Sequence, residues 1–250
     1  MIHRAFLRFY EELNDFLPED KKKVRFTHEF IHQTSVKDMI ESLGVPHSEI
    51  DLILVNGQSV NFEYPVKDND DISIYPVFES FDISEVTHLR SKPLRVPRFI
   101  NDIHLGKLAR YMRLLGFDTL CMKDITKDEL VEISLEQSRG ILTRDRHLLK
   151  RNEITHGYWI RNEDPFEQIL EVIGRFHLEN EISEFSRCMN CNGILVNAAK
   201  EDIADKIPER VRQYHNDFYQ CAACRKVYWK GSHYSRMQTL IENIKRKTRH

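Results

Sequence analysis

Two aspartates occupy positions from which they could support catalysis. Asp102 closes the segment 98–102 and Asp145 closes the segment 140–145, and the apolar residues in each segment predict a buried strand. Basic residues stand close to both aspartates in the chain. Carboxylates at the ends of parallel strands, with cations nearby, suit a metal-dependent enzyme that acts on phosphodiesters.

Two more acids follow the neighbouring apolar run, 119–122: Asp124 lies just past it, and Asp128 opens the next predicted helix. Ligands of a parallel α/β sheet bind beyond the carboxyl ends of its strands, so we expect all four aspartates to border one crevice. Because carboxylates repel each other, such a cluster needs a divalent cation, and oxygen ligands favour Mg²⁺ or Mn²⁺. The metal would activate water, and basic side chains would hold the nucleic-acid backbone: Lys107, Arg110, Arg144 and Arg146.

Ordinary structural roles are open to the same aspartates. A single acid after a strand is commonly a helix cap or a turn residue. Asp102 could cap the following helix, and Asp145 could pair with Arg144 or Arg146 on the surface. Asp128 suits the first turn of a helix because the helix dipole favours negative charge there. Position alone therefore leaves both roles open for each aspartate.

Four of the five cysteines form two pairs with ligand spacing, Cys188/Cys191 and Cys221/Cys224. Two CxxC turns separated by a few tens of residues are typical of a tetrahedral Zn²⁺ site, since each turn presents two thiolates. Four thiolates that leave no open position indicate a structural zinc. Cys121 lies in an apolar run and is predicted to be a small core residue.

The N-terminal residues, 1–81, predict a β-grasp (ubiquitin-like) domain. Two strand patterns precede a short helix over 35–43, and two further strand patterns follow it around the Asn56-Gly57 turn. The segments 53–58 and 68–76 resemble ubiquitin-like sulfur carriers of thiamine and molybdopterin synthesis. Carrier chemistry needs a free C-terminal Gly-Gly, whereas this chain runs on through Val77-Phe78-Glu79-Ser80-Phe81. We therefore expect a structural module, or one that docks a protein partner.

The rest of the chain predicts a linker and two further domains, for an α/β multidomain protein. Residues 82–97 contain prolines and are the predicted linker. Residues 98–180 alternate short strands with helices, which predicts an α/β domain with a parallel sheet. Residues 183–250 hold the cysteine pairs and an amphipathic stretch that ends in a basic helix, which predicts a zinc ribbon with a C-terminal helix.

Bulk properties set wider limits. The formal net charge of −2 gives no general attraction to nucleic acid, so such a role must rest on local basic patches. No apolar run approaches the roughly 20 residues of a membrane span, and the N-terminus lacks the layout of a secretory signal. We therefore expect a cytoplasmic protein without a membrane partner.

Three blocks of sequence point to one family. The blocks are Phe99-Ile100-Asn101-Asp102 with the run Leu105 to Thr119, then Arg139 to Arg146, and the cysteine-rich stretch from Arg187 to Tyr234. They resemble the Mut-seven C-terminal RNase domain family of PIN-like nucleases, including its zinc-ribbon end, and bacterial members often carry an N-terminal ubiquitin-like module. The resemblance implies metal-dependent ribonuclease activity, with Asp102 and Asp145 as metal-binding acids. Around Asp102 the chain reads Asn101-Asp102-Ile103-His104, whereas many members have an apolar residue before the acid and Met-Leu after it.

The function predicted first is thus hydrolysis of RNA, which we expect to be single-stranded, through a carboxylate-bound Mg²⁺ or Mn²⁺ ion. The alternative is a non-catalytic RNA- or ribosome-binding module with a ubiquitin-like docking domain. A third interpretation is a toxin-like nuclease restrained by its acidic N-terminal surface. Clustered acids favour catalysis, because a pure binding module gains nothing from the electrostatic cost of gathering them.

Overall fold

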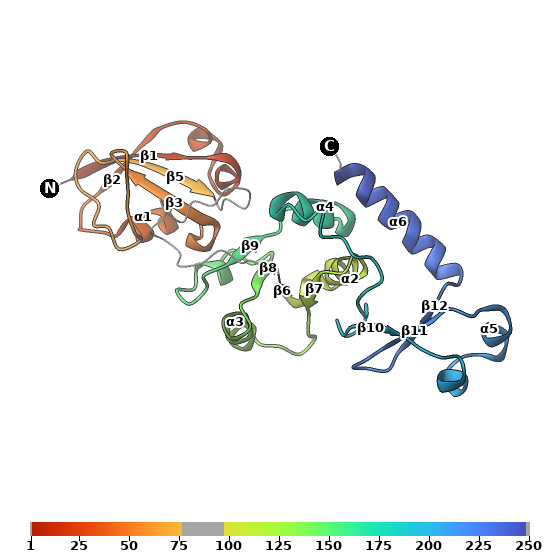
Figure 1. The fold of residues 1–250 in the computed structure, drawn as a ribbon. Coiled ribbons are helices and arrows are strands. Elements are labelled where there is room, and N and C mark those ends of the chain that lie inside the picture. The colour runs from red at the N-terminus through yellow and green to blue at the C-terminus, as the bar shows by residue number, and fades with distance from the viewer. Residues whose placement is uncertain (1, 77–97, 249–250) are drawn as a thin grey trace. The chain divides into compact units, whose positions relative to one another are not determined.

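The computed structural model describes residues 2–76 and 98–248 (Figure 1). Its contacts separate two compact units. The N-terminal unit comprises Met1–Arg95, Leu135–Gln137 and Asp145–Trp159, and the C-terminal unit comprises Val96–Ser134, Ser138–Arg144 and Ile160–His250. The predicted linker, 82–97, lies outside the described residues. The predicted domain boundaries stay a prediction.

The N-terminal unit contains a mixed five-stranded sheet of order β2-β1-β5-β3-β4. Strands β1 and β5 pair in parallel, and the other pairs are antiparallel. This sheet, with one helix following the first hairpin, confirms the predicted N-terminal module. The elements are β1 (His3–Phe9), β2 (Phe26–Phe30), α1 (Val36–Ser42), β3 (Ile50–Val55), β4 (Gln58–Ser59) and β5 (Asp71–Pro76), with three short 3-10 helices, η1 (Glu11–Phe16), η2 (Glu19–Lys21) and η3 (His47–Glu49).

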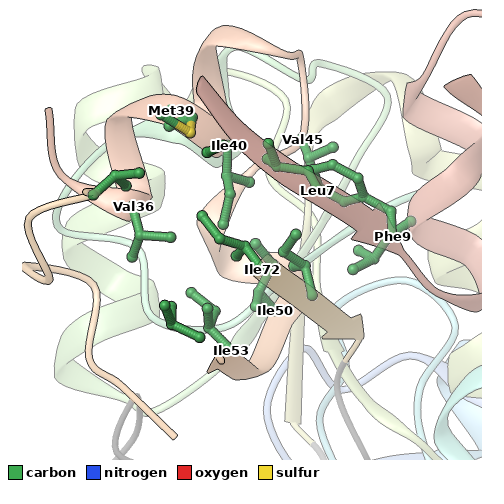
Figure 2. Close-up of a cluster of buried hydrophobic side chains, with 14 of the residues drawn as sticks. Leu7, Phe9, Val36, Met39, Ile40, Val45, Ile50, Ile53 and Ile72 are labelled. Carbon is green, nitrogen blue, oxygen red and sulfur yellow. The ribbon is translucent and has the colours of Figure 1, made fainter. Parts of the chain in front are cut away.

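The core of this unit follows from the apolar spacing of the sequence (Figure 2). Alternate residues of β1 are buried, and α1 buries Val36, Met39 and Ile40, which share one face of the helix. Ser35 caps α1, since its hydroxyl oxygen accepts the Asp38 N–H at 3.1 Å. The hairpin between β3 and β4 turns at Asn56 and Gly57, whose φ angles of 51° and 82° are those of the predicted Asn-Gly turn.

The segment 145–159 packs within the N-terminal unit. It contains η5 (Leu148–Lys150) and β9 (Gly157–Trp159). The Ser48 hydroxyl donates to the Leu149 carbonyl at 3.0 Å, and the Trp159 ring lies 5.0 Å from the Phe16 ring between centroids. These contacts bury the irregular chain after Asp145 against η1 and η3.

The C-terminal unit contains a parallel arrangement of strands and helices, as predicted. Strand β6 (Arg98–Asn101) lies between β7 (Asp118–Leu120) and β8 (Gly140–Thr143), and both pairings are parallel. All four residues of β8 are buried, as expected for a strand that is covered on both faces. The helices are α2 (Gly106–Leu114), α3 (Lys127–Glu136) and α4 (Pro165–Phe176), with a short 3-10 helix, η4 (Ile103–Leu105), directly after β6.

The cysteine-rich end of the same unit is a small antiparallel sheet of order β10-β11-β12. A few apolar side chains form its core, chiefly Ile203, Ile207 and Phe218. The elements are β10 (Leu195–Asn197), η6 (Glu201–Lys206), α5 (Glu209–Tyr214), β11 (Phe218–Cys221), β12 (Val227–Trp229) and α6 (Ser232–Thr248). Helix α6 buries Ile241 and Ile244, which belong to the predicted amphipathic stretch.

Among the described residues, no helix combines the length and the apolarity needed to cross a membrane.

Two glycines of the C-terminal unit should respond in opposite ways to alanine. Gly116 ends α2 with φ of +98°, and an added Cβ would come 2.3 Å from the Ser183 carbonyl oxygen. Gly174 lies inside α4, and a Cβ added there would meet open space. We expect Gly116→Ala to lower the free energy of unfolding by about 2 kcal/mol or more, from αL strain and the backbone clash. Gly174→Ala should raise it by about 0.5–1 kcal/mol.

Urea denaturation of both variants measures the difference. Equal effects of the two substitutions would contradict the described environment of Gly116.

Candidate functional site

The four paired cysteines converge on one point. Their Sγ atoms all lie within 4.8 Å of one another, and this is the one convergent group of three or more possible metal ligands that the described residues form. Cys188 and Cys224 approach to 3.6 Å between Sγ atoms, and Cys191 and Cys221 approach to 3.4 Å. Thiolates around a tetrahedral Zn²⁺ lie about 3.8 Å apart. The cluster therefore fits a closed structural zinc site.

Hydrogen bonds prepare Cys188 to act as a thiolate. Burial raises the pKa of this thiol, but the Tyr228 hydroxyl, at 3.0 Å, and the backbone N–H groups of Cys191 and Asn190 lower it more, to about 7. Burial and the same contact with Cys188 raise the pKa of Tyr228, so this phenol stays protonated and donates. Tyr228 thus orients one thiol of the cluster from outside the four cysteines, as the outer partners of metal ligands do.

The first cysteine turn is fixed to the parallel sheet by a buried cation. Arg113, on α2, donates to the carbonyl oxygens of Met189 at 3.2 Å and Asn190 at 3.1 Å. It also donates to the Thr119 carbonyl on β7 at 2.8 Å. Burial lowers the pKa of Arg113 from its usual value. One guanidinium therefore ties β7 to the carbonyl groups inside the Cys188-to-Cys191 turn.

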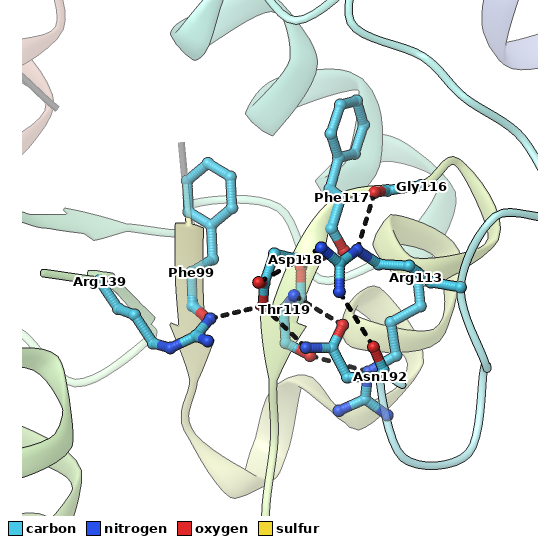
Figure 3. A network of polar contacts seen from close by, with 9 residues as sticks. Phe99, Arg113, Gly116, Phe117, Asp118, Thr119, Arg139 and Asn192 are labelled. Carbon is cyan, nitrogen blue, oxygen red and sulfur yellow. Dashed lines mark hydrogen bonds and ion pairs between the residues drawn. The ribbon is translucent and has the colours of Figure 1, made fainter. Parts of the chain in front are cut away.

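Asp118, the first residue of β7, is the acid that contacts the arginines beside the first cysteine turn (Figure 3). Its carboxylate accepts from Arg139 at 2.6 Å and from the Asn192 amide at 2.7 Å, and it lies 3.3 Å from Arg187. Burial raises the pKa of Asp118, but these hydrogen bonds and positive charges lower it below the ordinary 3.8. Asp118 therefore neutralises charge on Arg139 and Arg187, whose side chains are largely buried.

Asp102 lies directly after β6 and both caps η4 and binds the end of β8. Its Oδ1 accepts the His104 N–H at 2.8 Å. Its Oδ2 accepts a short hydrogen bond from the Thr143 hydroxyl and a longer one from the Arg144 N–H at 3.3 Å. The carboxylate is thus held at the carboxyl ends of two parallel strands, which is where ligands of such sheets bind.

Asp124 and Asp128 are exposed. Asp124 lies in a turn after β7, and Asp128 lies in the first turn of α3. A capping box starts this helix: the Thr126 N–H donates to the Glu129 carboxylate at 2.8 Å, and the Glu129 N–H donates to the Thr126 hydroxyl at 3.2 Å. The cap of α3 is thus Thr126, which leaves Asp128 as a favourable charge near the positive end of the helix.

Asp145 belongs to the N-terminal unit, where its Oδ1 accepts the His147 N–H at 2.9 Å and the Leu148 N–H at 3.3 Å. Its neighbour Arg146 lies over the Trp159 ring, 3.6 Å from the centroid. Asp145 therefore holds the turn that leads into η5, which is one of the structural roles open to it from sequence. The surface pairing with Arg144 or Arg146 stays a prediction.

The other predicted cations lie in the C-terminal unit. Lys107 and Arg110 are both exposed on α2. Arg144 is also exposed, and its guanidinium donates to the Asn162 carbonyl at 2.6 Å and to the Glu163 carboxylate at 2.9 Å. Arg144 is thus engaged by the loop before α4, whereas Lys107 and Arg110 are presented to solvent.

Sequence reasoning missed the polar contacts that hold the cysteine turn. Arg113, Asp118, Arg139 and Asn192 carry no periodic or motif signal, because their partners lie far away in the chain. The capping box of α3 was visible, since Thr126-Lys127-Asp128-Glu129 has the T-x-x-E pattern. The predicted Cys121 core position is half-buried, with its thiol 3.7 Å from the Asp102 carbonyl oxygen.

Comparison with protein families confirms the resemblance. The model described as Mut7-C RNAse domain matches residues 97–241, and the model described as Mut7-C ubiquitin matches residues 2–82. No curated protein and no solved structure matches the chain. The first match spans the parallel sheet and the cysteine cluster, and the second spans the N-terminal mixed sheet.

Removing the bound metal should unfold the small cysteine-rich sheet, because its few buried apolar side chains cannot hold it alone. Trp229 packs against that core and Trp159 lies in the other unit, so a Trp159→Phe variant reports on the sheet alone. We expect a strong chelator to release zinc and to shift the fluorescence of Trp229 towards that of exposed indole. Cys188→Ser should lose zinc and Cys121→Ala should keep it.

Unchanged Trp229 fluorescence after verified loss of zinc would contradict a structural role for the metal.

Neutralising Asp118 should destabilise the C-terminal unit in a pH-dependent way. Asp118→Asn removes the ion pair that Asp118 makes with Arg139, whose side chain is 8% exposed, so we expect a loss of about 3 kcal/mol at neutral pH. Because the folded-state pKa lies below the ordinary 3.8, this stabilisation is present above about pH 4 and is lost as pH falls through the lowered value. The variant should therefore show a shallower loss of stability on acidification.

Urea denaturation at several pH values measures both effects. Asp217→Asn is the control, because it removes an exposed ion pair with Lys230, and solvent-screened pairs of this kind contribute little to stability. Equal losses in the two variants would count against the buried role of Asp118.

Proposed function

The chain belongs to the Mut7-C RNAse domain family, and we propose that it is a metal-dependent ribonuclease that hydrolyses RNA phosphodiester bonds. The proposal rests on one observation above all: Asp102 directly follows β6, and its carboxylate is hydrogen-bonded to the carboxyl end of the neighbouring strand β8. Such a position suits binding of a ligand or metal ion. We propose Asp102 and Asp145 as the acids that hold Mg²⁺ or Mn²⁺.

The carboxylate oxygens of Asp102 could bind such an ion. A carboxylate has about four lone-pair directions, and the three described hydrogen bonds to Asp102 leave one of them, on Oδ1. Oxygen ligands are those that Mg²⁺ and Mn²⁺ prefer. When bound, the ion would lower the pKa of a water molecule and stabilise charge on the attacked phosphate. Asp145 is proposed from its position after β8 and from the family resemblance.

The remaining predicted residues have supporting roles in this proposal. Asp124 and Asp128 are exposed acids that would contribute through water or directly. Lys107 and Arg110, both exposed on α2, would contact phosphates of the substrate, because neither position is covered by the fold. Arg144 and Arg146 would do so only by giving up contacts that they make in the structure.

The cysteine cluster and the N-terminal module would serve the enzyme without taking part in the reaction. We propose that the four cysteines bind structural zinc, since the cluster is closed and its ligands are fixed by Arg113 and Tyr228. We propose that the ubiquitin-like module contacts a protein partner, since β-grasp modules without a C-terminal Gly-Gly lack the chemistry of conjugation.

Substitution of the two acids tests the catalytic proposal. We expect wild type to cleave labelled single-stranded RNA in Mg²⁺ or Mn²⁺, and Asp102→Asn and Asp145→Asn each to lower the rate by about 100-fold or more. Such a loss corresponds to about 3 kcal/mol of transition-state stabilisation, a size expected for loss of a metal ligand. Gel electrophoresis of the cleavage products measures the rate.

Asp164→Asn is the matched control, because Asp164 caps α4 through the same kind of N–H contacts and Asn caps equally well. It should cleave like wild type. If wild type binds RNA and none of several metals yields cleavage, the protein is the non-catalytic binding module. If both acid variants cleave at the wild-type rate, the assignment of the acids is wrong.

A further inference from the structure

A pocket of about 960 Å³ opens on the cysteine-rich part of the C-terminal unit. Its walls come from α5, from β12 and from the first turns of α6, with Met189 of the first cysteine turn at one side. This volume lies at the upper end of the range of about 300–1,000 Å³ that is usual for ligand pockets. The pocket is separate from the strand-end acids, none of which lines it.

Positive charge dominates the lining. Arg210, Lys226 and Arg236 border the pocket together with two histidines, and no acidic residue is among the described residues that line it. All three cations are exposed. A pocket with this lining attracts anions.

The described part of the chain gives these three cations no acidic partner, whereas four cations outside the lining have one. Lys230 pairs with Asp217 at 3.3 Å, and Arg212 pairs with Glu209 at 2.7 Å. On α6 two lysines beyond the pocket pair with Glu184 and Glu167. Acids of the fold thus neutralise these four cations and leave those of the pocket available.

Aromatic rings make up much of the remaining wall, and most of them are held in place. Tyr228 is fixed by its hydrogen bond to Cys188, and Tyr234 stacks on Phe185 with centroids 4.6 Å apart. The backbone of Gly231 lies against the Trp229 indole, because an added Cβ would come 2.9 Å from its Nε1. Tyr214 differs, since it is 75% exposed and so presents a free ring at the rim.

We propose that this pocket binds single-stranded RNA, with bases stacked on its aromatic rings and phosphates held by Arg210, Lys226 and Arg236. The inference rests on the proposed function in taking RNA as the substrate, and it adds a binding site that is distinct from the acids. Stacking requires unpaired bases, so the pocket selects single strands over duplexes. Single-stranded RNA uses both the aromatic rings and the cations without an acidic partner, whereas an acidic peptide would need only the cations.

Fluorescence anisotropy with a short fluorescein-labelled single-stranded RNA tests the proposal in an Asp102→Asn background, in buffer without chelator. We expect Tyr214→Leu to weaken binding about tenfold and Tyr214→Trp to preserve it, because base stacking needs an aromatic surface. The double variant Arg210→Ala/Arg236→Ala should also weaken binding about tenfold. It should lower the slope of log Kd against log salt by about 1.4, or about 0.7 for each phosphate of the single strand that the variant no longer neutralises.

The double variant Lys245→Ala/Lys247→Ala is the control, because it removes the same charge from residues outside the pocket. Its affinity should stay within about twofold of the parent. The proposal is overturned if the parent does not bind single-stranded RNA, if Tyr214→Leu binds like the parent, or if both double variants lose the same affinity. It is also overturned if duplex RNA or a polyglutamate peptide competes as well as the single strand does.

This binding test and the cleavage test fail independently. Loss of affinity in the pocket variants, with no cleavage by wild type in any metal, would support the pocket and reject the catalytic proposal. Cleavage that depends on Asp102, with unchanged affinity in the pocket variants, would reject the pocket alone.

Discussion

The C-terminal unit depends on a single residue next to the cysteine turn, Asn192. Its side-chain oxygen accepts the Thr119 N–H at 3.0 Å, and its amide donates to Asp118 at 2.7 Å. Strand β7 is an edge of the parallel sheet, and an edge strand leaves N–H groups that need partners. Asn192 supplies the partner of the Thr119 N–H. It directly follows Cys191 and has a φ of 70°, a left-handed conformation that asparagine tolerates. The turn that shapes the cysteine cluster is therefore also the element that completes the edge of the sheet.

Buried charge reinforces this connection. Arg113 and Arg187 both bind the cysteine turn, the first through carbonyls inside the turn and the second through the Asn192 carbonyl at 3.0 Å. Asp118 provides the compensating negative charge for Arg187 and for Arg139. A loosened cysteine turn would take from Arg113 and Arg187 the carbonyl acceptors that the turn provides, and unsatisfied donors in a low-dielectric environment are costly. The geometry of the cysteine cluster and the order of β7, which pairs with β6, are thus coupled, and Asp102 directly follows β6.

Local pattern predicted much of this structure, and long-range polar contacts account for what it missed. Periodicity identified the buried face of α1 and the strands β6 to β8, and the CxxC spacing identified the four cysteines that converge. Short 3-10 helices such as η1 and η4 have too few residues to show a period. The partners of Asp118 lie 21 and 74 residues away, so no window of sequence contains them. The sequence also could not show that the chain after Asp145 packs against η1 and η3. That packing depends on contacts between residues more than 100 positions apart in the chain.

The alternatives for Asp102, helix cap or functional acid, turn out not to exclude each other. Capping η4 uses Oδ1 towards the His104 N–H, and contact with β8 uses Oδ2. Both sets of donors hold the carboxylate in one orientation. A metal ligand or general base that is already oriented loses no further side-chain entropy when the ion or substrate binds. An aspartate that was free of such contacts would need to be ordered by the ligand itself. The structural role of Asp102 therefore adds to the case for its catalytic one, because the same hydrogen bonds that cap the helix preorganise the carboxylate.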